Sequence, residues 1–437
     1  MAIDFRFIKK ETIRGIAEAV KNYLTRDGED ISIANVPTLI ENNFNKDLRN
    51  IVEADGRGPM QYVFLEETQL KGVTKIGAHA LKGWSYLKTL GLPNSVTDIG
   101  YGACSGATTL ETVRIGNGVT NIGEQAFYGC SDLKNLTIGR DVSIIGESAF
   151  KGCSALESVV LPGRVTYIGD YIFSGCTNLS NITLGTMIKT IGKKAFENCK
   201  SLTDTNFITS SITDIGEYAF YKCENLLSAD TRNATSLGKG VFANCTSLES
   251  VNINECSEIP PFAFIDCTSL AEVYTEKEQC NIGEAAFKDC EHLSSSFVRD
   301  ILLKTLNIGN YAFSNATDAD IINIPGTVAT IGGYAFSDNQ NLASILFSSD
   351  KEGSKLESIG SHAFANCSQL SSIIFLGSTS VPQYLGNLKD EITSICRIHV
   401  PYSLYDEWIT APNWCDIADR IGIIQSTIPT EEEETDV

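Results

Sequence analysis

Apolar and polar positions recur along this chain with a fixed period. The phrase Ile-Gly-x-x-Ala-Phe-x-x-Cys-x-x-Leu runs in full from Ile122 to Leu133, and related phrases precede and follow it. A period of this length predicts a solenoid, in which each unit buries its apolar side against its neighbours. The first five steps are each 23 residues, and the phrases begin at Ile76, Ile99, Ile122, Ile145, Ile168, Ile191, Ile215, Leu237, Ile259, Ile282, Ile308, Ile331 and Ile359.

Each phrase is followed by a short segment in which apolar and polar positions alternate. Between Leu156 and Pro162, for example, the apolar side chains Val159 and Leu161 stand two positions apart, which predicts a β-strand. The Gly of the phrase predicts a tight turn, and its Ala and Phe are expected to point inward. Residues 59–376 are therefore predicted to form 13 stacked units, each with one short parallel strand and an irregular or single-turn helical return path.

The spacing lengthens twice near the end of the array. The step from Ile282 to Ile308 is 26 residues, and the step from Ile331 to Ile359 is 28 residues. We expect the extra residues to form loops at 294–304 and 349–355. Such loops are either tolerated surface insertions or recognition features, and the sequence leaves both readings open.

The segments that flank the array lack the repeat. Apolar positions within residues 1–58 follow helical spacing in two stretches, so we expect two amphipathic helices that attach or oligomerise the protein. Residues 377–425 are expected to form a C-terminal cap, in which Arg397 to Pro401 is the final strand and Trp408 and Trp414 cover the last open face of the core. Residues 426–437, which include four consecutive glutamates, are predicted to be a disordered acidic tail.

Charge and hydropathy narrow the range of partners. The formal net charge is −20, which argues against a nucleic-acid groove or an anionic membrane surface, because both need clustered Lys and Arg. Nowhere does the chain hold the roughly 18 consecutive apolar residues of a membrane span, and no apolar export segment of roughly 7 to 15 residues is visible after Met1. We therefore expect no nucleic-acid partner and no membrane insertion.

The residues that could carry chemistry are arranged as ladders. Zinc sites need paired Cys or His at short spacing, which is lacking here, so the cysteine ladder is predicted to consist of small, buried, reduced thiols. A parallel phenylalanine ladder is expected to be a core spine. The four histidines are isolated, and no catalytic or phosphate-binding motif is present, so we expect no cofactor, no metal and no enzymatic activity. The cysteine ladder comprises Cys130, Cys153, Cys176, Cys199, Cys223, Cys245, Cys267, Cys290 and Cys367.

Alternate positions of the predicted strands face outward and carry mostly short polar side chains. Such a surface can hydrogen-bond a glycan or a flat protein, and Arg114 and Tyr274 are residue types that anchor interfaces. The alternative is a solvated sheet face, with binding elsewhere on the molecule. The candidate ligand-facing residues are Arg114, Thr137, Thr183, Asn206, Asp230, Asn252 and Tyr274.

The repeated phrase, together with the Leu161-Pro162 pair that follows one copy of it, resembles the BspA-type leucine-rich repeat over residues 70–376. This resemblance implies a leucine-rich-repeat solenoid of the α/β type, with short parallel strands and an irregular or short-helical convex side, that serves as a binding scaffold. Proteins of this type are bacterial surface and adhesion proteins, and some are encoded by phages. Residues 11–21 also resemble a helical segment of tail-associated proteins of phages and prophages of Gram-positive bacteria, and residues 400–421 resemble the closing segment of such repeat proteins.

The absence of a visible export signal and the resemblance of residues 11–21 favour a virion protein of a phage tail tip or baseplate, made in the host cytoplasm. In this hypothesis residues 1–58 join other tail proteins and form a homo-oligomer, while the array contacts a glycan or protein of the host bacterial surface. The alternative is a bacterial cell-surface leucine-rich-repeat adhesin. A third reading, an internal tail scaffold that binds no receptor, is not separated from the first by the sequence.

Overall fold

The computed structural model describes residues 63–65, 70, 73–253, 255–349 and 353–424. The helices predicted within residues 1–58 and the tail predicted at 426–437 lie outside the described residues. The chain divides into two compact units. Unit 1 comprises the residues up to Cys256 together with Ala263–Glu276, and unit 2 comprises Ser257–Phe262 together with the residues from Lys277 onward.

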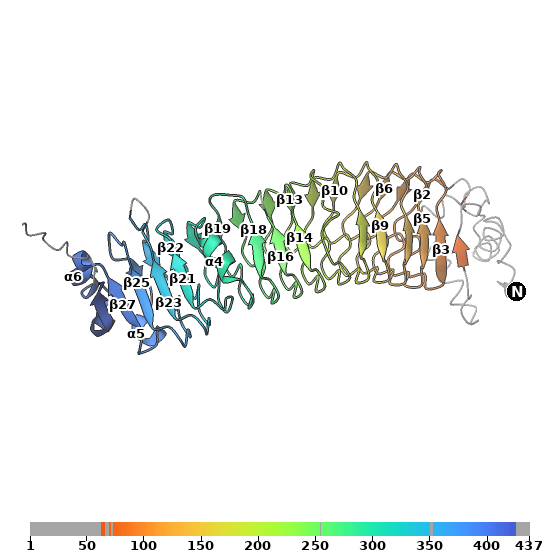
Figure 1. Cartoon of the computed structure of the whole chain (residues 1–437). Coiled ribbons are helices and arrows are strands. Elements are labelled where there is room, and N and C mark those ends of the chain that lie inside the picture. Colours follow the sequence, from red (N-terminus) through yellow and green to blue (C-terminus); the bar gives the residue numbers. More distant parts are fainter. Residues whose placement is uncertain (1–62, 66–69, 71–72, 254, 350–352, 425–437) are drawn as a thin grey trace, which may run out of the picture. The chain divides into compact units, whose positions relative to one another are not determined.

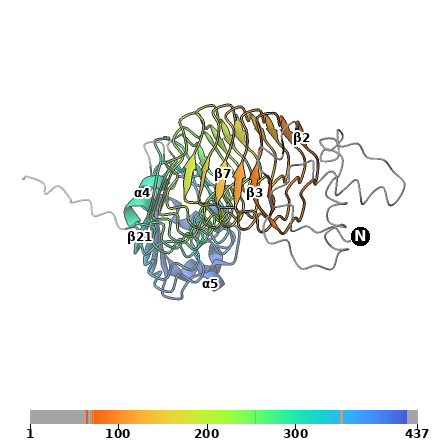
Figure 2. The ribbon, with the colours of Figure 1, turned by 90° about the vertical axis from the view of Figure 1, so that its right-hand side faces the viewer.

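Unit 1 is a coil whose turns contribute to two ladders of parallel strands. Figure 1 shows the short strands β2, β6 and β10 in one row and the longer strands β3, β5 and β9 in another, and Figure 2 shows β2 and β3 on different walls of the coil. The short strands are β2 (Lys75–Ile76), β4 (Asp98–Ile99), β6 (Asn121–Ile122), β8 (Ile144–Ile145), β10 (Tyr167–Ile168), β12 (Thr190–Ile191), β13 (Asp214–Ile215) and β15 (Ser236–Leu237). The longer strands are β1 (Val63–Leu65), β3 (Leu87–Gly91), β5 (Thr112–Arg114), β7 (Asn135–Thr137), β9 (Ser158–Val160), β11 (Asn181–Thr183), β14 (Ser228–Asp230), β16 (Ser250–Asn252) and β18 (Glu272–Tyr274).

The ladder of short strands differs from the prediction of one strand per unit. The Ile that opens each phrase is itself the buried second residue of a two-residue strand, as Ile122 is in β6. The N–H of Gly123 then donates to the carbonyl of Ile99 in the preceding turn at 2.7 Å. A Cβ on Gly123 would lie 2.7 Å from the carbonyl carbon of Gly100, so the glycine is required because successive turns approach too closely for a side chain.

The Ala-Phe part of the phrase forms an irregular turn. The sequence predicts either an irregular or a single-turn helical return path, and the structure has the irregular one. In one such turn, the N–H groups of Gln125, Phe127 and Gly129 donate to carbonyls of the following turn, at 2.9, 2.8 and 2.7 Å. Gln125 and Gly129 have φ values of 56° and 69°, in the left-handed region, while the residues between them do not. Between these two left-handed residues, the side chains of Ala126 and Phe127 are buried in the core.

The core of unit 1 is built from the two predicted ladders. The rings of Phe127, Phe150 and Phe173 are fully buried and stack with centroid separations of 5.4 and 5.8 Å. The predicted phenylalanine spine is therefore confirmed. The ladder thiols are buried beside it and act as donors: Sγ of Cys153 donates to the carbonyl of Phe127 at 3.3 Å, and Sγ of Cys176 donates to that of Phe150 at 3.2 Å.

Unit 2 repeats the two-ladder arrangement. Its short strands are β17 (Glu258–Ile259), β19 (Asn281–Ile282), β20 (Asn307–Ile308), β22 (Thr330–Ile331), β24 (Ser358–Ile359) and β26 (Gln383–Tyr384), and they form one parallel sheet. Its longer strands form a second sheet and are β21 (Ile321–Ile324), β23 (Ser344–Phe347), β25 (Ser372–Phe375), β27 (Arg397–Val400) and β28 (Ile421–Ile423). The strand predicted at residues 397–401 is thus β27, but it is not the final strand, because β28 pairs with it.

The first insertion is a helix rather than the predicted loop. Helix α4 (Ser295–Leu302) begins after Ser294, whose hydroxyl accepts the N–H of Phe297 at 3.1 Å as an N-cap. It lies beside β21 (Figure 2), with Phe297, Ile301 and Leu302 buried. Apolar burial outweighs loop flexibility here, because these side chains share one face of a helix. In the second insertion, residues 350–352 lie outside the described residues.

The C-terminal part of unit 2 consists of short helices, α5 (Leu388–Glu391), η3 (Tyr402–Leu404), α6 (Tyr405–Trp408) and η4 (Cys415–Arg420). Trp408 and Trp414 are buried, as the predicted cap requires, and their ring centroids lie 4.6 Å apart. Both rings contact Phe375 of β25. Nε1 of Trp414 donates to the carbonyl of Pro382 at 2.9 Å, so its polar edge is satisfied within the cap.

Candidate binding surface

The outward face of the longer strands in unit 1 carries six of the seven candidate ligand-facing residues. In β5 and β18 the central valine is buried and the third residue, Arg114 or Tyr274, is exposed. The parallel register places Arg114 beside Thr137, and Asn252 beside Tyr274. The candidates that lie on strands therefore form a row along unit 1, interrupted at the turns of Val160 and Asn206.

The middle of this row is uncharged. The side-chain amides of Asn135 and Asn181 donate to Thr112 and Ser180, but hydroxyl groups beside them are available. Thr137 and Thr183 are exposed, and their hydroxyls make no hydrogen bond within the described residues. Val160 lies beside Thr183 in the register and is 63% exposed. Val160 is missing from the candidates predicted from the sequence because only polar side chains were considered. The alternation of the strand by itself places Val160 outward. We name this middle part the neutral strip, and it comprises Asn135, Thr137, Ser158, Val160, Asn181 and Thr183.

Asn206 is exposed but does not lie on a strand, so its predicted place in the strand row is wrong. The buried hydroxyl of Thr205 takes the place of a ladder hydrogen bond: it accepts the N–H of Asp230 at 2.8 Å and donates to the carbonyl of Asp230 at 3.2 Å. The carboxylate of Asp204 accepts the N–H of Asn206 at 2.9 Å, which turns the chain away from the strand direction.

The far end of the row is acidic, and its groups already have partners. Asp230 and Asn252 are half-buried, and Asp230 accepts the N–H of Arg232 at 2.8 Å and forms an ion pair with its guanidinium at 3.5 Å. The hydroxyl of the exposed Tyr274 donates to the carboxylate of Glu272, and this hydrogen bond raises the pKa of Tyr274 above its usual value. The neutral strip is therefore the part of the row with more free hydrogen-bonding groups.

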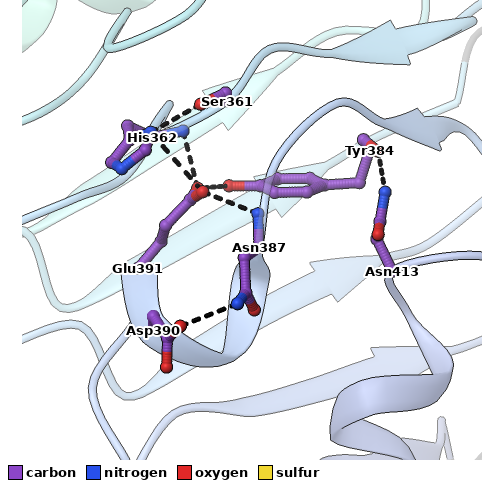
Figure 3. Close-up of polar contacts among 7 residues, drawn as sticks. All are labelled: Ser361, His362, Tyr384, Asn387, Asp390, Glu391 and Asn413. Carbon is purple, nitrogen blue, oxygen red and sulfur yellow. Dashed lines mark hydrogen bonds and ion pairs between the residues drawn. The ribbon is translucent and has the colours of Figure 1, made fainter.

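A second polar cluster, in unit 2, contains the residue types of a hydrolase triad (Figure 3). In a working triad the histidine contacts the nucleophile and the carboxylate through opposite ring nitrogens. Here Oγ of Ser361 lies 2.5 Å from Nδ1 of His362, and Oε1 of Glu391 lies 3.5 Å from the same nitrogen. A proton cannot be relayed across the ring in this arrangement, so the cluster is not a triad.

Glu391 instead closes the hydrogen-bond ladder of the turns. In the preceding turn the N–H of Tyr334 donates to the carbonyl of Ser361 at 3.0 Å. The equivalent N–H, that of His362, donates to Oε2 of Glu391 at 2.6 Å, so the carboxylate stands in for the carbonyl of a further repeat. The hydroxyl of Tyr384 donates to the same oxygen (Figure 3), and burial together with this hydrogen bond raises the pKa of Tyr384.

The buried cysteines are unsuited to chemistry in the folded protein. Burial raises the pKa of Cys130 and of Cys176 to about 12, so both thiols stay protonated at neutral pH and are poor nucleophiles and metal ligands. No three His, Cys, Asp or Glu side chains come together as a metal site in the part of the chain that the structure describes. No described helix has the length and apolar character needed to cross a membrane.

Comparison with known proteins gives a family match over most of the array. The model of the BspA type leucine rich repeat region matches residues 61–180, 143–271 and 257–387. These matches begin well after residues 11–21, so they give no support to the resemblance of that segment to phage tail proteins. No protein with a curated description matches the chain.

Solved structures to which the chain is similar include bacterial leucine-rich-repeat proteins. One from Bacteroides ovatus is 24% identical, with a TM-score of 0.53, over 77% of this chain and 83% of that chain. A leucine rich cell surface protein from Faecalibacterium prausnitzii is 20% identical, with a TM-score of 0.39, over 85% and 89% of the two chains. A leucine rich repeat protein from T. pallidum is 29% identical, with a TM-score of 0.35, over 38% and 78%.

Proposed function

Because this chain belongs to the family of the BspA type leucine rich repeat region, a repeat fold that presents extended surfaces, we propose that it is a non-enzymatic binding protein that acts as a bacterial surface adhesin. Its ligand contacts the neutral strip of unit 1. The observation that carries this proposal is the row of exposed, unpaired hydroxyls around Val160, on β7 and on the parallel pair β9 and β11. Such a surface suits a hydroxyl- and amide-rich partner, either a glycan or a flat protein surface.

The resemblance that favours a role in a phage tail is confined to residues 11–21, which lie outside both the described residues and the matched range. No contact or surface of units 1 and 2 favours it. We therefore prefer the adhesin and propose that it is displayed on the bacterial surface. We also propose that the N-terminal segment forms an oligomer.

A pair of charge variants tests this proposal on the full-length protein. Thr137→Glu/Thr183→Glu places two negative charges on the neutral strip, whereas Thr166→Glu/Thr190→Glu places the same charge at exposed positions at or beside the short-strand ladder. Fluorescently labelled protein is titrated onto intact bacterial and epithelial cells. We expect saturable binding that is lost in the first variant and kept in the second. Equal binding by both variants would remove the neutral strip as the site, and no binding to any cell by the unaltered protein would refute the adhesin role.

A further inference from the structure

The left-handed turn positions of unit 1 hold an unexpected set of side chains. The Ala-Phe segment of each turn has two such positions, and the second is occupied by Gly, Asn or Asp in every described turn of unit 1 except at Lys222, where φ is 59°. The first position holds Tyr171, Lys194 and Tyr218 in three successive turns, with φ of 55°, 52° and 54°. A left-handed conformation costs an ordinary residue about 1–2 kcal/mol. Backbone preference does not account for these residues. Because His79, Gln125 and Ser148 occupy the same position in other turns, the three turns differ from them in the type of side chain.

These side chains gather into one cluster on the turns of unit 1. Nζ of Lys151 lies 4.5 Å from the ring centre of Tyr171, and Nζ of Lys222 lies 5.2 Å from that of Tyr221. Nζ of Lys194 lies 5.8 Å from the rings of both Tyr218 and Tyr221. We name this cluster the lysine–tyrosine island, and it comprises Lys151, Tyr171, Lys194, Tyr218, Tyr221 and Lys222.

The island has donors that the protein leaves unused. Lys194 is paired with Glu197 at 2.8 Å, but Lys151 and Lys222 have no carboxylate partner within the described residues. The tyrosine hydroxyls of the island likewise make no hydrogen bond there, and their rings are only half-buried. Two ammonium groups without a carboxylate partner therefore lie in one cluster of turns, on a chain whose net charge is −20.

We propose that the lysine–tyrosine island is a second binding surface, separate from the neutral strip, and that it takes an acidic polysaccharide. Lys151 and Lys222 belong to turns three steps apart, which corresponds to about 14 Å at the spacing of stacked strands. That separation is too long for one small anion, but two carboxylate groups a few sugars apart on an extended polymer can bridge it. The half-exposed rings between them offer apolar surface to the C–H groups of sugar rings, and the phenols offer hydrogen bonds to sugar hydroxyls.

The charges around the island set the mode of binding. Glu147 and Asp170 are exposed in the neighbouring row, where Asp170 accepts the backbone N–H of Lys193 at 2.8 Å. Long-range attraction of a polyanion is therefore weak, and binding depends on direct contact with the two unpaired ammonium groups. Affinity should accordingly fall as the salt concentration rises, because direct contacts between opposite charges release bound counterions.

Binding of the full-length protein to polygalacturonate, with uncharged dextran as the matched neutral polymer, tests this inference by biolayer interferometry. We expect binding to polygalacturonate only, weakened about tenfold by Lys151→Gln/Lys222→Gln. The control Lys134→Gln/Lys189→Gln removes two exposed lysines elsewhere on unit 1 and leaves the same net charge. Tyr221→Ala, which removes a ring at a position outside the left-handed region, should weaken binding about fivefold.

Three outcomes would overturn the proposal. Equal losses in the two lysine variants would show an effect of net charge without a local site. Unchanged affinity in Tyr221→Ala would remove the ring contact on which the choice of a polysaccharide rests, and equally tight binding of an oligothymidylate would assign the island to polyanions in general. The Thr137→Glu/Thr183→Glu variant should bind polygalacturonate normally, so failure of the adhesin proposal and failure of this one are distinguishable.

Discussion

Replacement of Glu391 tests how the repeat array of unit 2 ends. The carboxylate accepts the N–H of His362 at 2.6 Å and the N–H of Asn387 at 2.8 Å, and it also accepts the hydroxyl of Tyr384. Only 2% of its side chain is exposed, so water cannot replace it freely. Glu391→Ala therefore leaves buried donors without an acceptor, whereas Glu391→Gln keeps one oxygen and presents an amide NH₂ to at least one donor.

The expected magnitude follows from these contacts. A hydrogen bond to a charged group contributes about 1.5–3 kcal/mol, and an orphaned buried donor costs a similar amount. We expect Glu391→Ala to lower the local free energy of opening by about 3 kcal/mol, and Glu391→Gln by about half as much, because one oxygen remains to accept. In hydrogen exchange, 3 kcal/mol corresponds to about a 150-fold loss of protection.

Amide hydrogen exchange measured by mass spectrometry is the appropriate assay, because a long repeat array need not unfold in a two-state manner. Protection should fall at His362, Asn387 and the neighbouring strand β26, while peptides of unit 1 stay unchanged and serve as the internal reference. If the amide of His362 keeps its protection in Glu391→Ala, the carboxylate does not close the ladder and the capping argument fails.

Three further predictions concern the core. Phe173→Ala removes a fully buried ring stacked between Phe150 and Phe196 and should lower the local free energy of opening by about 3–5 kcal/mol in amide hydrogen exchange, whereas Phe173→Leu should cost much less. The pKa values of Cys130 and Cys176 are raised from 9.0 to about 12, so the unfolded thiols ionise above pH 9 while the folded thiols do not. Each thiol should therefore reduce the stability of the folded state by about 1.4 kcal/mol at pH 10 relative to pH 7. Urea midpoints that do not change between these two pH values would contradict this prediction. Under native conditions a thiol reagent should label Cys415, which is the exposed cysteine of the described residues. Rapid labelling of further cysteines before unfolding would show that their thiols are not buried from solvent.

The parts of the fold that could be predicted are those in which packing repeats. A constant period with Phe and Cys at fixed positions identifies stacked turns, because identical inward positions are what neighbouring turns require of one another. The short strands were beyond prediction for a physical reason: two residues cannot show the alternation by which a strand is recognised. Helix α4, by contrast, carries a readable signal, since Ser294 is a good N-cap and Phe297 and Ile301 stand four positions apart.

The binding surface divides in the same way. Strand alternation places Thr137 and Thr183 outward, and the structure agrees. The predicted position of Asn206 on a strand is wrong because the hydroxyl of Thr205 makes hydrogen bonds with the backbone of Asp230, 25 residues away. No local sequence pattern reveals such a contact. The lysine–tyrosine island was equally hidden, because its members come together only once the turns are stacked and the left-handed positions are known.

The role of the cysteine ladder is clarified by the one turn that replaces Cys with Asn. Burial alone would favour any small apolar residue, yet Asn339 occupies the ladder position, is 2% exposed, and donates its amide to the carbonyls of Phe313 and Phe336 at 2.9 and 2.8 Å. The carbonyl of Phe313 is the equivalent of the one that Cys176 reaches from its own turn, that of Phe150. A hydrophobe cannot make this bond, whereas a thiol and an amide both can. The position therefore favours a small buried donor. Ala107 and Ala316 stand there without one, which shows that the packing tolerates the loss of the donor at individual turns.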